Sequence, residues 1–518
     1  MSKLMTNSTV CTAPVCHHLV EELDLKLPFW RYHGIFQSDS YSFLLDSAKD
    51  SQKLGRFSFL GGDPFLVCRS KRIPGAEAVL DARIEVLELA SPEGERFTKP
   101  VFKRRQGNPF EDLRNLMNAF AIDHSQYCKC PVPLISGAVG YFGYESGHFV
   151  EQLPDRGCDD LGLPDSYFMF VDTLLAHRHQ AEKSYLSVVG RGRTDEAARR
   201  AAESSRDAML ARIEAFEANP PAERPAISPR QAAQTQIEVK THFDEVSYCQ
   251  TVAEIKERIF AGDIFEACLT HRLDSPLDGG GPWDLYEELR RVNPAPFACY
   301  LNFPEAQVVS ASPERFLSLD QNRIAESRPI KGTRPRGATV REDERLRQQL
   351  FQSIKDRAEH VMIVDLVRND FGRVCKFHSV NVPELMIIEP YATVFQLVST
   401  VRGELRPEVS GMDLIKACFP GGSMTGAPKI EAMKIIDRLE PVKRGIYSGS
   451  IGYLDFSGRL DFSIVIRSFV VKNGRCYYNV GGAIVADSDP LAEYLETMDK
   501  AGALKTALTS LKASSQTT

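Results

Sequence analysis

The stretch SGSIGYLDFSGRLDFSIVIRSFVVKNGRCYYNVGGAIV, Ser448 to Val485, decides the fold class of this chain. Three of its segments are rich in aromatic and β-branched residues, and the dipeptide Asn473-Gly474, typical of tight hairpin turns, separates the last two. The pattern predicts consecutive antiparallel strands. In this interpretation Arg467 ends the apolar strand FSIVIR, so its guanidinium should leave the sheet in a fixed geometry suited to a carboxylate.

Outward from this stretch, the chain divides into two halves joined by a linker. Residues 17–190 contain short strand-like segments separated by Gly, Pro and Asp. Residues 191–240 predict a surface helix over 194–218, with Thr194 as its N-cap, followed by a proline-rich linker without a packed element. Residues 241–512 alternate helical and strand patterns. We therefore expect an α+β protein built on large antiparallel sheets.

Composition limits the classes of function. The chain has 518 residues, 43% of them hydrophobic, and a formal net charge of −6, so it can form a large core and lacks the basic excess of a nucleic-acid binder. No run approaches the ~18 consecutive apolar residues of a membrane span, and the N-terminal segment lacks the apolar core of a signal peptide. The scattered cysteines are typical of reduced cytosolic thiols. We expect a cytoplasmic protein that binds neither membranes nor nucleic acid.

Two helical patterns in the C-terminal half carry paired carboxylates. A long amphipathic helix predicted over 341–370 has Asp356 and Glu359 three residues apart and therefore on one face, and the terminal helix has Glu493 and Glu496 at the same spacing. Each pair alone is typical of a solvated helix face. Together the pairs suit a hard divalent cation such as Mg²⁺, which takes one or two carboxylates and fills its shell with water and an anionic ligand.

Glycine-rich segments could supply donors for such a ligand. FPGGSMTGAPK, residues 419–429, lacks the spacing of a phosphate loop, but its glycines could bring backbone N–H groups to a carboxylate at a helix that begins with Pro428. VGGAIVADSDP offers a second glycine pair. RPIKGTRPRG, residues 328–337, is predicted to be a loop, and its Lys331 is either a solvated cation or a nucleophile. Together these features describe a magnesium site for a multiply carboxylated small molecule.

The motifs, taken in order, resemble those of the chorismate-utilising enzymes, which include the component I subunits of anthranilate and aminodeoxychorismate synthases. The matching segments are SPERFL, RPIKGTRPRG, AEHVMIVDLVRND, VFQLVSTVRG, FPGGSMTGAPK, GIYSGSIGY, IVIRSF, GGAIVADSDP and EYLETMDKA. A looser match, LLDSAKDSQKLGRFSFLGGDP, lies in the N-terminal half. The resemblance implies a two-part sandwich with surrounding helices, in which residues 17–190 form an N-terminal domain and residues 241–512 the chorismate-binding catalytic domain.

The resemblance also implies a role for individual positions. Glu359 and Glu496 would hold Mg²⁺, supported by Asp356 and Glu493, and the metal would bind the ring carboxylate of chorismate. The other chorismate-binding positions would be Arg467, Tyr447, Thr425, Gly426, Gly481 and Ala483. At the last of these the chain departs from the glycine that family members often carry.

Two positions favour amination para to the ring carboxylate. Anthranilate synthases resemble the stretch around Lys331 but carry alanine there, whereas aminodeoxychorismate synthases carry lysine. A lysine that adds at C2 expels the 4-hydroxyl, after which ammonia can add at C4 and expel the lysine. We expect burial beside positive charge to lower the pKa of Lys331 so that it can attack. Gln396 stands where anthranilate synthases usually have a histidine associated with pyruvate elimination.

Two further glutamates have alternative interpretations. Glu314 is either the acid that protonates the leaving hydroxyl or the ion-pair partner of an arginine. Glu266 replaces a residue that is commonly glutamine in aminating members, and it either helps to receive ammonium or forms an ion pair.

The resemblance therefore predicts the aminodeoxychorismate-forming branch, which leads to p-aminobenzoate and folate. Ammonia would be free or would come from a separate glutamine amidotransferase subunit, and a separate lyase would act on the product. The alternatives are the anthranilate-forming branch and a non-catalytic subunit that senses an aromatic precursor. A tryptophan site of the anthranilate branch would use Leu45, Ser47, Asn293, Pro294 and Phe297, which are otherwise core and turn residues.

Overall fold

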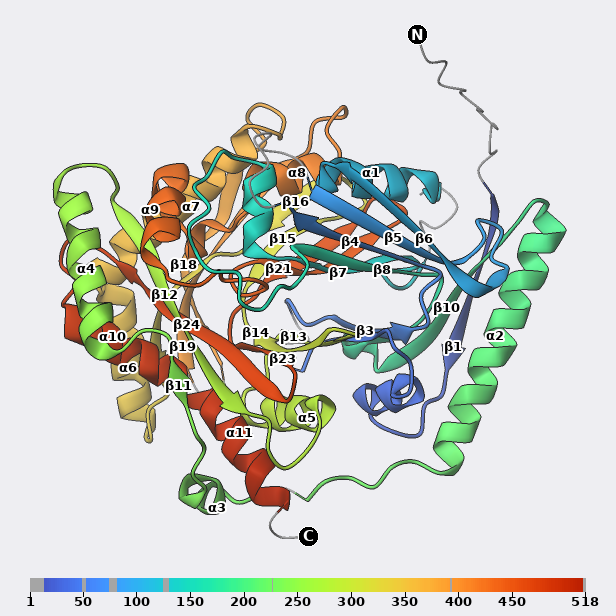
Figure 1. The fold of residues 1–518 in the computed structure, drawn as a ribbon, viewed down its shortest axis with the longest axis horizontal. Coiled ribbons are helices and arrows are strands. Elements are labelled where there is room, and N and C mark those ends of the chain that lie inside the picture. The colour runs from blue at the N-terminus through green and yellow to red at the C-terminus, as the bar shows by residue number, and fades with distance from the viewer. Residues whose placement is uncertain are drawn as a thin grey trace.

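Two large antiparallel sheets form the middle of the protein (Figure 1). The computed structural model describes residues 14–48, 53–73, 82–123, 130–225, 227–391 and 394–515. Within these ranges each sheet has twelve strands. The predicted α+β class with large antiparallel sheets is confirmed.

The strands of the two sheets follow each other in space as follows. The first sheet contains, in order, β1 (Val15–Leu23), β10 (Lys183–Gly192), β9 (Thr173–Arg178), β3 (Phe57–Gly62), β2 (Ser42–Asp46), β13 (Phe297–Phe303), β14 (Ala306–Ser312), β23 (Ser468–Lys472), β24 (Arg475–Ile484), β12 (Glu266–Pro276) and β11 (Lys240–Thr241), and β20 (Gly426–Ala427) pairs with β12. The second contains β17 (Ile330–Pro335), β19 (Val394–Glu404), β16 (Ile324–Ser327), β15 (Arg315–Leu319), β22 (Leu460–Ile464), β21 (Ser450–Asp455), β7 (Gly137–Phe142), β8 (Ser166–Val171), β4 (Leu66–Arg72), β5 (Ala82–Ala90) and β6 (Arg96–Gly107), and β18 (Asn381–Pro390) pairs with β19.

Each sheet combines strands from both halves of the sequence. In the first sheet β2 pairs with β13, which places Leu45 opposite Cys299. In the second sheet β7 pairs with β21, which places Tyr141 opposite Ile451. The two halves therefore share both sheets instead of forming separate ones, and the boundaries at 17–190 and 241–512 remain predictions.

Alternation of side chains along the strands produces a layered core. Phe43 of β2 and Phe59 of β3 point between the sheets and pack in one cluster with Met169 of β8. Their neighbours Leu44 and Leu60 point the opposite way, into a second cluster under helices. A third cluster lies on the outer face of the second sheet, so the order of layers is helices, sheet, sheet, helices.

Helices cover both outer faces. The helices are α1 (Pro109–Ala119), α2 (Asp195–Ala218), α3 (Pro229–Gln234), α4 (Glu245–Phe260), α5 (Pro282–Val292), α6 (Val340–Gln352), α7 (Ile354–Gly372), α8 (Gly411–Cys418), α9 (Lys429–Leu439), α10 (Pro490–Lys500) and α11 (Gly502–Ser515). In Figure 1, α2 lies along β1 and β10 at one end of the molecule, and α4, α6 and α10 lie at the other. Among the described residues, no helix is long and apolar enough to cross a membrane.

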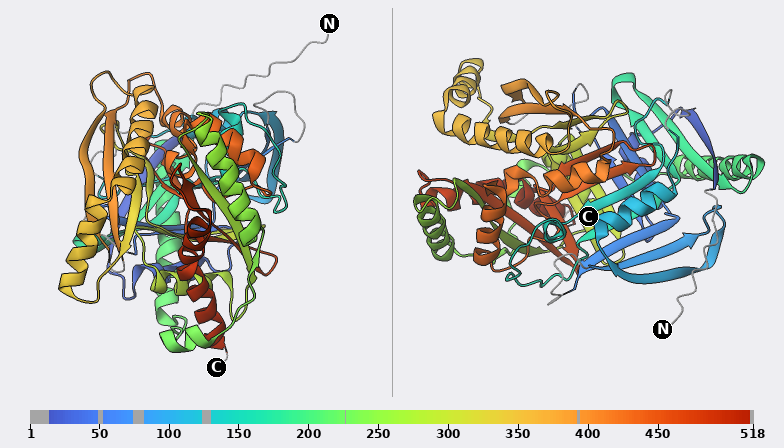
Figure 2. Two further views of the ribbon diagram at one scale, coloured as in Figure 1. Left: turned by 90° about the vertical axis from the view of Figure 1, so that its left-hand side faces the viewer. Right: turned by 90° about the horizontal axis from the view of Figure 1, so that it is seen from above.

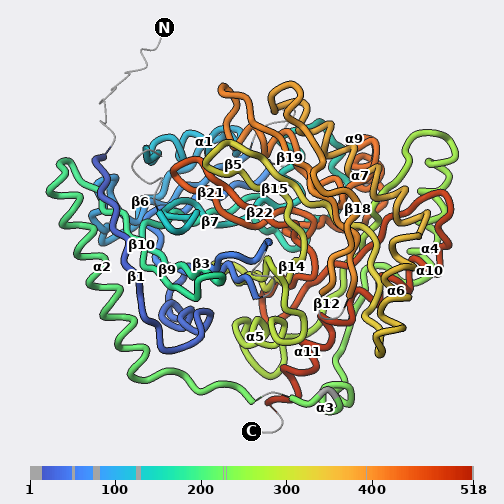
Figure 3. The backbone as a smooth tube through the Cα atoms, turned by 180° about the vertical axis from the view of Figure 1, so that it is seen from behind, coloured from blue at the N-terminus to red at the C-terminus, as the bar shows by residue number. Residues whose placement is uncertain are grey.

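The helices α4, α6, α7 and α10 mark the side of the molecule that contains the motifs. The left view of Figure 2 faces this side. Seen from behind in Figure 3, α6 and α7 lie beside β18 and β19.

Two local predictions are confirmed. Thr194 caps α2, because its side chain accepts a hydrogen bond from the amide of Ala197. Asn473 and Gly474 have φ angles of 50° and 72° and turn β23 into β24, as the Asn-Gly hairpin signature predicts.

Three helix predictions are wrong in detail. The helix predicted over 341–370 is two helices, because Ser353 is extended and its side chain caps α7 by accepting from the amide of Asp356. The proline-rich linker contains the short helix α3, because Ser228 and Gln231 form a capping box at its start. Pro428 is the N-cap of α9 and not its first helical residue.

One loop prediction and one strand prediction near the motifs are also wrong. Lys331 lies on a strand, β17, because the extended segment pairs with β19 and Gly332, with a φ of 76°, allows a bulge in it. The run 460–472 is two strands in different sheets, β22 and β23. Arg467 lies in the crossover between them with a φ of 52° and does not end a continuous strand.

Candidate active site

Lys331 is held inside the protein by a carboxylate. The residue lies on β17, opposite Leu397 of β19, and its side chain is 11% exposed. Its Nζ donates a hydrogen bond of 2.7 Å to Oε1 of Glu266, the first residue of β12. The predicted nucleophile is therefore an ion-paired residue inside the predicted site and not a solvated cation.

The charge next to Lys331 is negative, which contradicts the expectation of positive neighbours. Burial by itself would lower the pKa of Lys331, but the carboxylate of Glu266 outweighs burial, so the pKa is raised above its ordinary value. The prediction of a lowered pKa is therefore wrong. Of the two interpretations of Glu266, the structure contains the ion pair.

Glu359 and Glu493 approach one another across α7 and α10. Lys355 lies between them, with its Nζ 4.0 Å from Oε1 of Glu359 and 3.5 Å from Oε1 of Glu493. Oε1 of Glu359 is buried and has no hydrogen-bond partner among the described residues, and burial raises the pKa of this carboxyl to about 7. Glu493 accepts a hydrogen bond of 2.7 Å from Ser488. A surface lysine thus occupies the space between the two carboxylates.

The other two predicted acidic residues have partners of their own. Asp356 pairs with Arg334 at 2.7 Å. Glu496 pairs with Lys500 at 2.8 Å, and its pKa is lowered because this lysine and Lys355 outweigh the effect of burial. In the described ranges no three His, Cys, Asp or Glu side chains form a group that could hold a metal ion on protein ligands alone.

The glycine-rich loop packs directly against the residue that holds Lys331. Gly426 has a φ of 145°, and a Cβ atom on it would lie 2.1 Å from the carbonyl oxygen of Glu266, so only glycine fits. The amide of Cys268 donates to the carbonyl of Thr425 at 2.8 Å. The hydroxyl of Thr425 donates within the loop, to the carbonyls of Gly421 and Gly422.

Tyr447 and Arg467 come from two loops that are bonded to each other. The amide of Ser448 donates to the carbonyl of Val465, and the amide of Val465 donates to the carbonyl of Gly449, each at 2.9 Å. Ser448 and Arg467 both have positive φ, a costly conformation for residues with a side chain that is often found at functional sites. Burial raises the pKa of Tyr447 and lowers that of Arg467.

The second glycine segment lies on β24 beside β12. Gly481 is opposite Thr270, and Ala483 is opposite Cys268. The carbonyl of Gly481 accepts a hydrogen bond of 2.9 Å from Lys500, and a Cβ on the next residue would lie 3.2 Å from Oε2 of Glu493. This segment therefore adjoins the acidic residues of α10.

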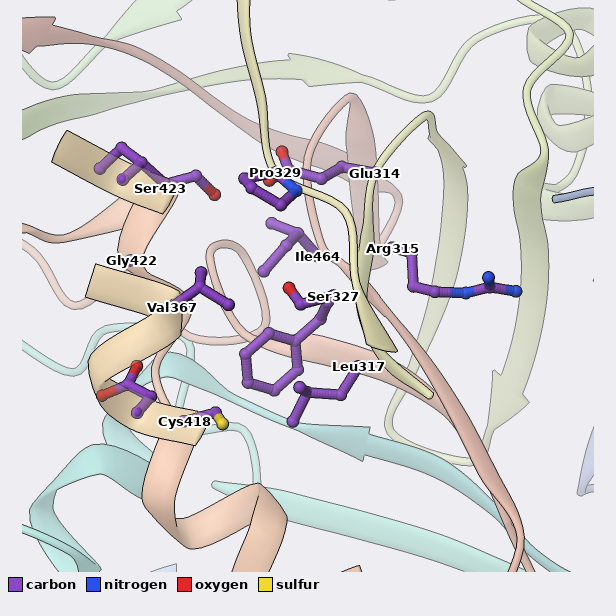
Figure 4. A pocket seen from close by; sticks show the side chains of 14 residues that line it. Glu314, Arg315, Leu317, Ser327, Pro329, Val367, Cys418, Gly422, Ser423 and Ile464 are labelled. Atoms are coloured by element: carbon purple, nitrogen blue, oxygen red, sulfur yellow. The ribbon is translucent and has the colours of Figure 1, made fainter. Parts of the chain in front are cut away.

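Glu314 lies at one end of a small cavity (Figure 4). The cavity has a volume of about 20 Å³, room for about one water molecule. Burial raises the pKa of Glu314 to about 7, against a hydrogen bond from Ser423 and the charge of Lys331. Glu314 can therefore hold a proton near neutral pH. Within the described ranges no arginine forms an ion pair with Glu314; the adjacent Arg315 pairs with Asp461 and Glu326.

Gln396 is buried on β19 opposite Thr333, two residues from Lys331 on β17. Its side-chain carbonyl has no hydrogen-bond partner in the described structure. A neutral amide therefore occupies the position at which relatives of the anthranilate branch are expected to carry histidine.

A second, larger cavity of about 570 Å³ lies between the two sheets. Leu45, Ser47 and Phe297, three of the residues predicted for a tryptophan site, line it. Asn293 and Pro294 are not among its lining residues; Asn293 is the C-cap of helix α5. The cavity walls include both charged and aromatic side chains.

Sequence reasoning missed a buried arginine that connects the parts of the site. Arg444 donates to the carbonyls of Met424 and Cys268, each at 2.7 Å, and to Glu440. Glu440 in turn accepts from the amide and hydroxyl of Thr270. Glu440 and Arg444 are four residues apart, which is also the usual spacing of an ion pair on the exposed face of a helix. The sequence therefore gives no sign that this pair is buried in the site.

Comparison with known proteins agrees with this fold and site. The family model described as chorismate binding enzyme matches residues 85–506, and the chain belongs to this family. It is 37% identical to anthranilate synthase component 1 of Acetivibrio thermocellus over 91% of each chain, and 36% identical to aminodeoxychorismate synthase component 1 of Bacillus subtilis over 93% of this chain and 96% of the relative.

The fold is similar to that of a solved relative. The crystal structure of anthranilate synthase component I from Streptococcus pneumoniae superimposes with a TM-score of 0.70 at 30% identity, over 88% of this chain and 95% of that one. This likeness confirms the predicted two-sheet architecture of the anthranilate synthase component I type. The near-equal identities to relatives of both names leave the position of amination to the site residues.

Proposed function

We propose that this chain is the chorismate-binding subunit of an aminodeoxychorismate synthase, which converts chorismate and ammonia to 4-amino-4-deoxychorismate. The observation that carries the proposal is the placement of Lys331. Its amine is buried, held at 2.7 Å by Glu266, in a site bounded by Glu359 and by the proton-holding Glu314. An amine held in this position can serve as a nucleophile toward a bound ring. A solvated lysine would lack this fixed orientation toward the ring.

The first half of the reaction would form a bond between Lys331 and C2 of the ring. As the C2–N bond forms, the two ring double bonds shift and the C4–O bond breaks. Glu314 protonates the departing hydroxyl, which leaves as water, and receives the proton that the lysine ammonium gives up. The sum is one ammonium and one alcohol converted to one alkylammonium and one water, so atoms and charge balance.

The second half would place nitrogen at C4. Ammonia adds there, the double bonds shift back, and the C2–N bond breaks to release Lys331. Nitrogen then stands para to the ring carboxylate. Gln396 supports an ending at this product, because a neutral amide cannot titrate to assist elimination of pyruvate.

The acidic side chains suit Mg²⁺ by their chemistry. Glu359 offers a buried oxygen that has no hydrogen-bond partner in the described structure, and Glu496 and Glu493 lie on the neighbouring helix. Mg²⁺ needs only one or two carboxylates from a protein, because water and an anionic ligand fill the rest of its shell. When bound by Glu359 and Glu496, Mg²⁺ would neutralise the ring carboxylate and withdraw electrons from the conjugated system.

Further components belong to the same proposal. A separate glutamine amidotransferase subunit would supply ammonia, and a lyase would act on the product on the route to p-aminobenzoate and folate. The name of the Bacillus subtilis relative, aminodeoxychorismate synthase component 1, supports a multi-component system of this kind.

The test is a product assay on the purified chain with chorismate, MgCl₂ and NH₄Cl. We expect 4-amino-4-deoxychorismate, and we expect Lys331→Ala to reduce its formation more than about a hundredfold, as loss of a covalent nucleophile does. Lys434→Ala, which removes a half-buried lysine of α9 that pairs with Glu431, is the control. If the native chain forms anthranilate, or if Lys331→Ala forms the para product at the native rate, the proposal is wrong.

The cavity between the sheets favours a second, compatible assignment. Its volume lies in the range of small-molecule sites, and Leu45, Ser47 and Phe297 line it, so we also propose that it binds tryptophan. Titration calorimetry should detect binding to the native chain and a weaker signal for Phe297→Ala. No heat of binding at millimolar tryptophan would eliminate this assignment without affecting the proposed reaction.

A further inference from the structure

The carboxylate that holds Lys331 has a second oxygen with no partner. Glu266 is 0% exposed, Oε1 accepts from Lys331, and Oε2 has no hydrogen-bond partner in the described structure. A buried carboxylate oxygen without a donor is unfavourable, and most such groups in native proteins are satisfied. A ligand that satisfies Oε2 must donate a hydrogen bond, and the negative charge favours a cation.

The backbone fixes this carboxylate in place. Glu266 pairs with Ala427 of β20, and the amide of Phe265 donates to the carbonyl of Ala427 at 2.7 Å. Gly426 packs against the Glu266 carbonyl with no room for a Cβ. The strand therefore cannot easily carry Glu266 to solvent, and its second oxygen stays beside the amine of Lys331.

We propose that Glu266 binds the nitrogen substrate as ammonium on Oε2 and carries a proton from it to Lys331. The inference rests on the proposed function and names the site of its second substrate. Ammonium has the same charge and the same N–H donors as the lysine head group that Oε1 already holds. One carboxylate would thus hold two ammonium nitrogens, one on each oxygen.

The geometry of the ring matches this arrangement. C2, which bears the lysine nitrogen in the adduct, and C4, which receives the new nitrogen, are separated by one ring atom. The two oxygens of a carboxylate are likewise separated by one carbon. Two nitrogens held side by side by Glu266 can therefore face C2 and C4 of one ring.

The proton balance needs no other reactant. Ammonium gives one proton to Oε2, and the ammonia so formed adds at C4 while the C2–N bond breaks. The departing lysine amine takes one proton from the carboxyl group of Glu266. Ammonium plus the lysine adduct thus become the product ammonium plus the Lys331 ammonium, and the resting ion pair is restored.

The experiment compares Glu266→Gln with the native chain, using NH₄Cl as the nitrogen source at constant ionic strength. We expect the KM for ammonium to rise about tenfold or more, the size of effect expected when a charge-assisted hydrogen bond is lost. The KM for chorismate should stay close to the native value. Glu254→Gln, an exposed glutamate of α4, is the matched control.

A second measurement separates substrate binding from a structural role. Intact-protein mass spectrometry of quenched Glu266→Gln should show more Lys331 adduct than the native chain, because the first half-reaction proceeds and the second is slowed. Should the glutamine variant not fold, Glu266→Asp carries the same test. In the native chain, potassium, which resembles ammonium in size and charge, should compete with ammonium more strongly than lithium.

The possible outcomes are distinct. An unchanged ammonium KM in the folded variant, with the para product still formed, overturns this inference alone, because water or nothing then occupies Oε2. Joint loss of adduct and turnover also overturns it, because Glu266 then serves only Lys331. An ortho product or an absent adduct in the native chain overturns the proposed function, and this inference with it.

Discussion

Gly426→Ala tests whether the glycine-rich loop sets the position of β12 and therefore of Glu266. The new Cβ would lie 2.1 Å from the Glu266 carbonyl oxygen and 2.9 Å from Cβ of Ala432, at a φ of 145°. To relieve this overlap, β20 must move away from β12. That movement weakens the hydrogen bonds from Phe265 to Ala427 (2.7 Å) and from Cys268 to Thr425 (2.8 Å).

The expected loss of stability follows from these contacts. Backbone strain at such a φ costs about 1–3 kcal/mol, and two weakened buried hydrogen bonds cost about 1 kcal/mol each, which gives about 3–5 kcal/mol in total. Gly458→Ala is the matched control. Gly458 has a φ of 92° in the turn between β21 and β22. Apart from its chain neighbours, no heavy atom of the described residues lies within 4 Å of its Cβ position, so only strain of about 1–2 kcal/mol is expected.

The measurements are urea unfolding followed by circular dichroism, and ammonia-dependent turnover at a temperature where both variants are folded. Because a displacement of about 1 Å at a catalytic group can cost about a hundredfold, Gly426→Ala should also lose turnover by about tenfold or more. Gly458→Ala should keep it. If Gly426→Ala is no less stable than Gly458→Ala and retains its turnover, the loop does not position β12 and the reasoning fails.

Three other changes test the electrostatics of the site. Arg444→Met leaves Glu440 as a buried, unpaired charge and should lower the free energy of unfolding by about 3–5 kcal/mol. Arg438→Met, which changes an exposed arginine of α9, should have little effect. Equal urea midpoints for the two variants would contradict this prediction. Burial raises the pKa of Glu314 from 4.5 to about 7, so the folded protein binds this proton more tightly than the unfolded chain does. The resulting contribution to the free energy of unfolding is fully present at low pH and is lost as pH rises through about 7. Turnover should fall over the same pH range. Glu314→Gln should remove this pH dependence from the urea midpoint of unfolding. If the midpoints of the variant and the native chain change identically with pH, Glu314 does not titrate in this range. Chelation of Mg²⁺ should abolish turnover, and Glu359→Gln should raise the Mg²⁺ concentration needed for half-maximal rate, so full activity in excess EDTA would exclude the metal.

Much of the local structure could be predicted because it depends on neighbours along the chain. Thr194 caps α2 through an amide three residues away, and Asn473-Gly474 turns a hairpin whose strands are adjacent in sequence. Where prediction failed, tertiary contact overrode local pattern. RPIKGTRPRG carries proline and glycine and looks like a loop. Its residues Ile330–Pro335 nevertheless form β17, because β19 offers a partner strand some sixty residues later in the chain.

For the candidate site, the sequence by itself determined which chemical groups are present: a lysine, two carboxylate pairs at helical spacing, and glycines where backbone must approach closely. Tertiary structure decided which of them meet. Glu266 and Lys331 are 65 residues apart, and Cys268 and Arg444 are 176 apart, so strand pairing and helix packing bring them together. The direction of the Lys331 pKa shift followed from that placement, because electrostatic interactions depend on distance in space and on burial, neither of which can be read along the chain.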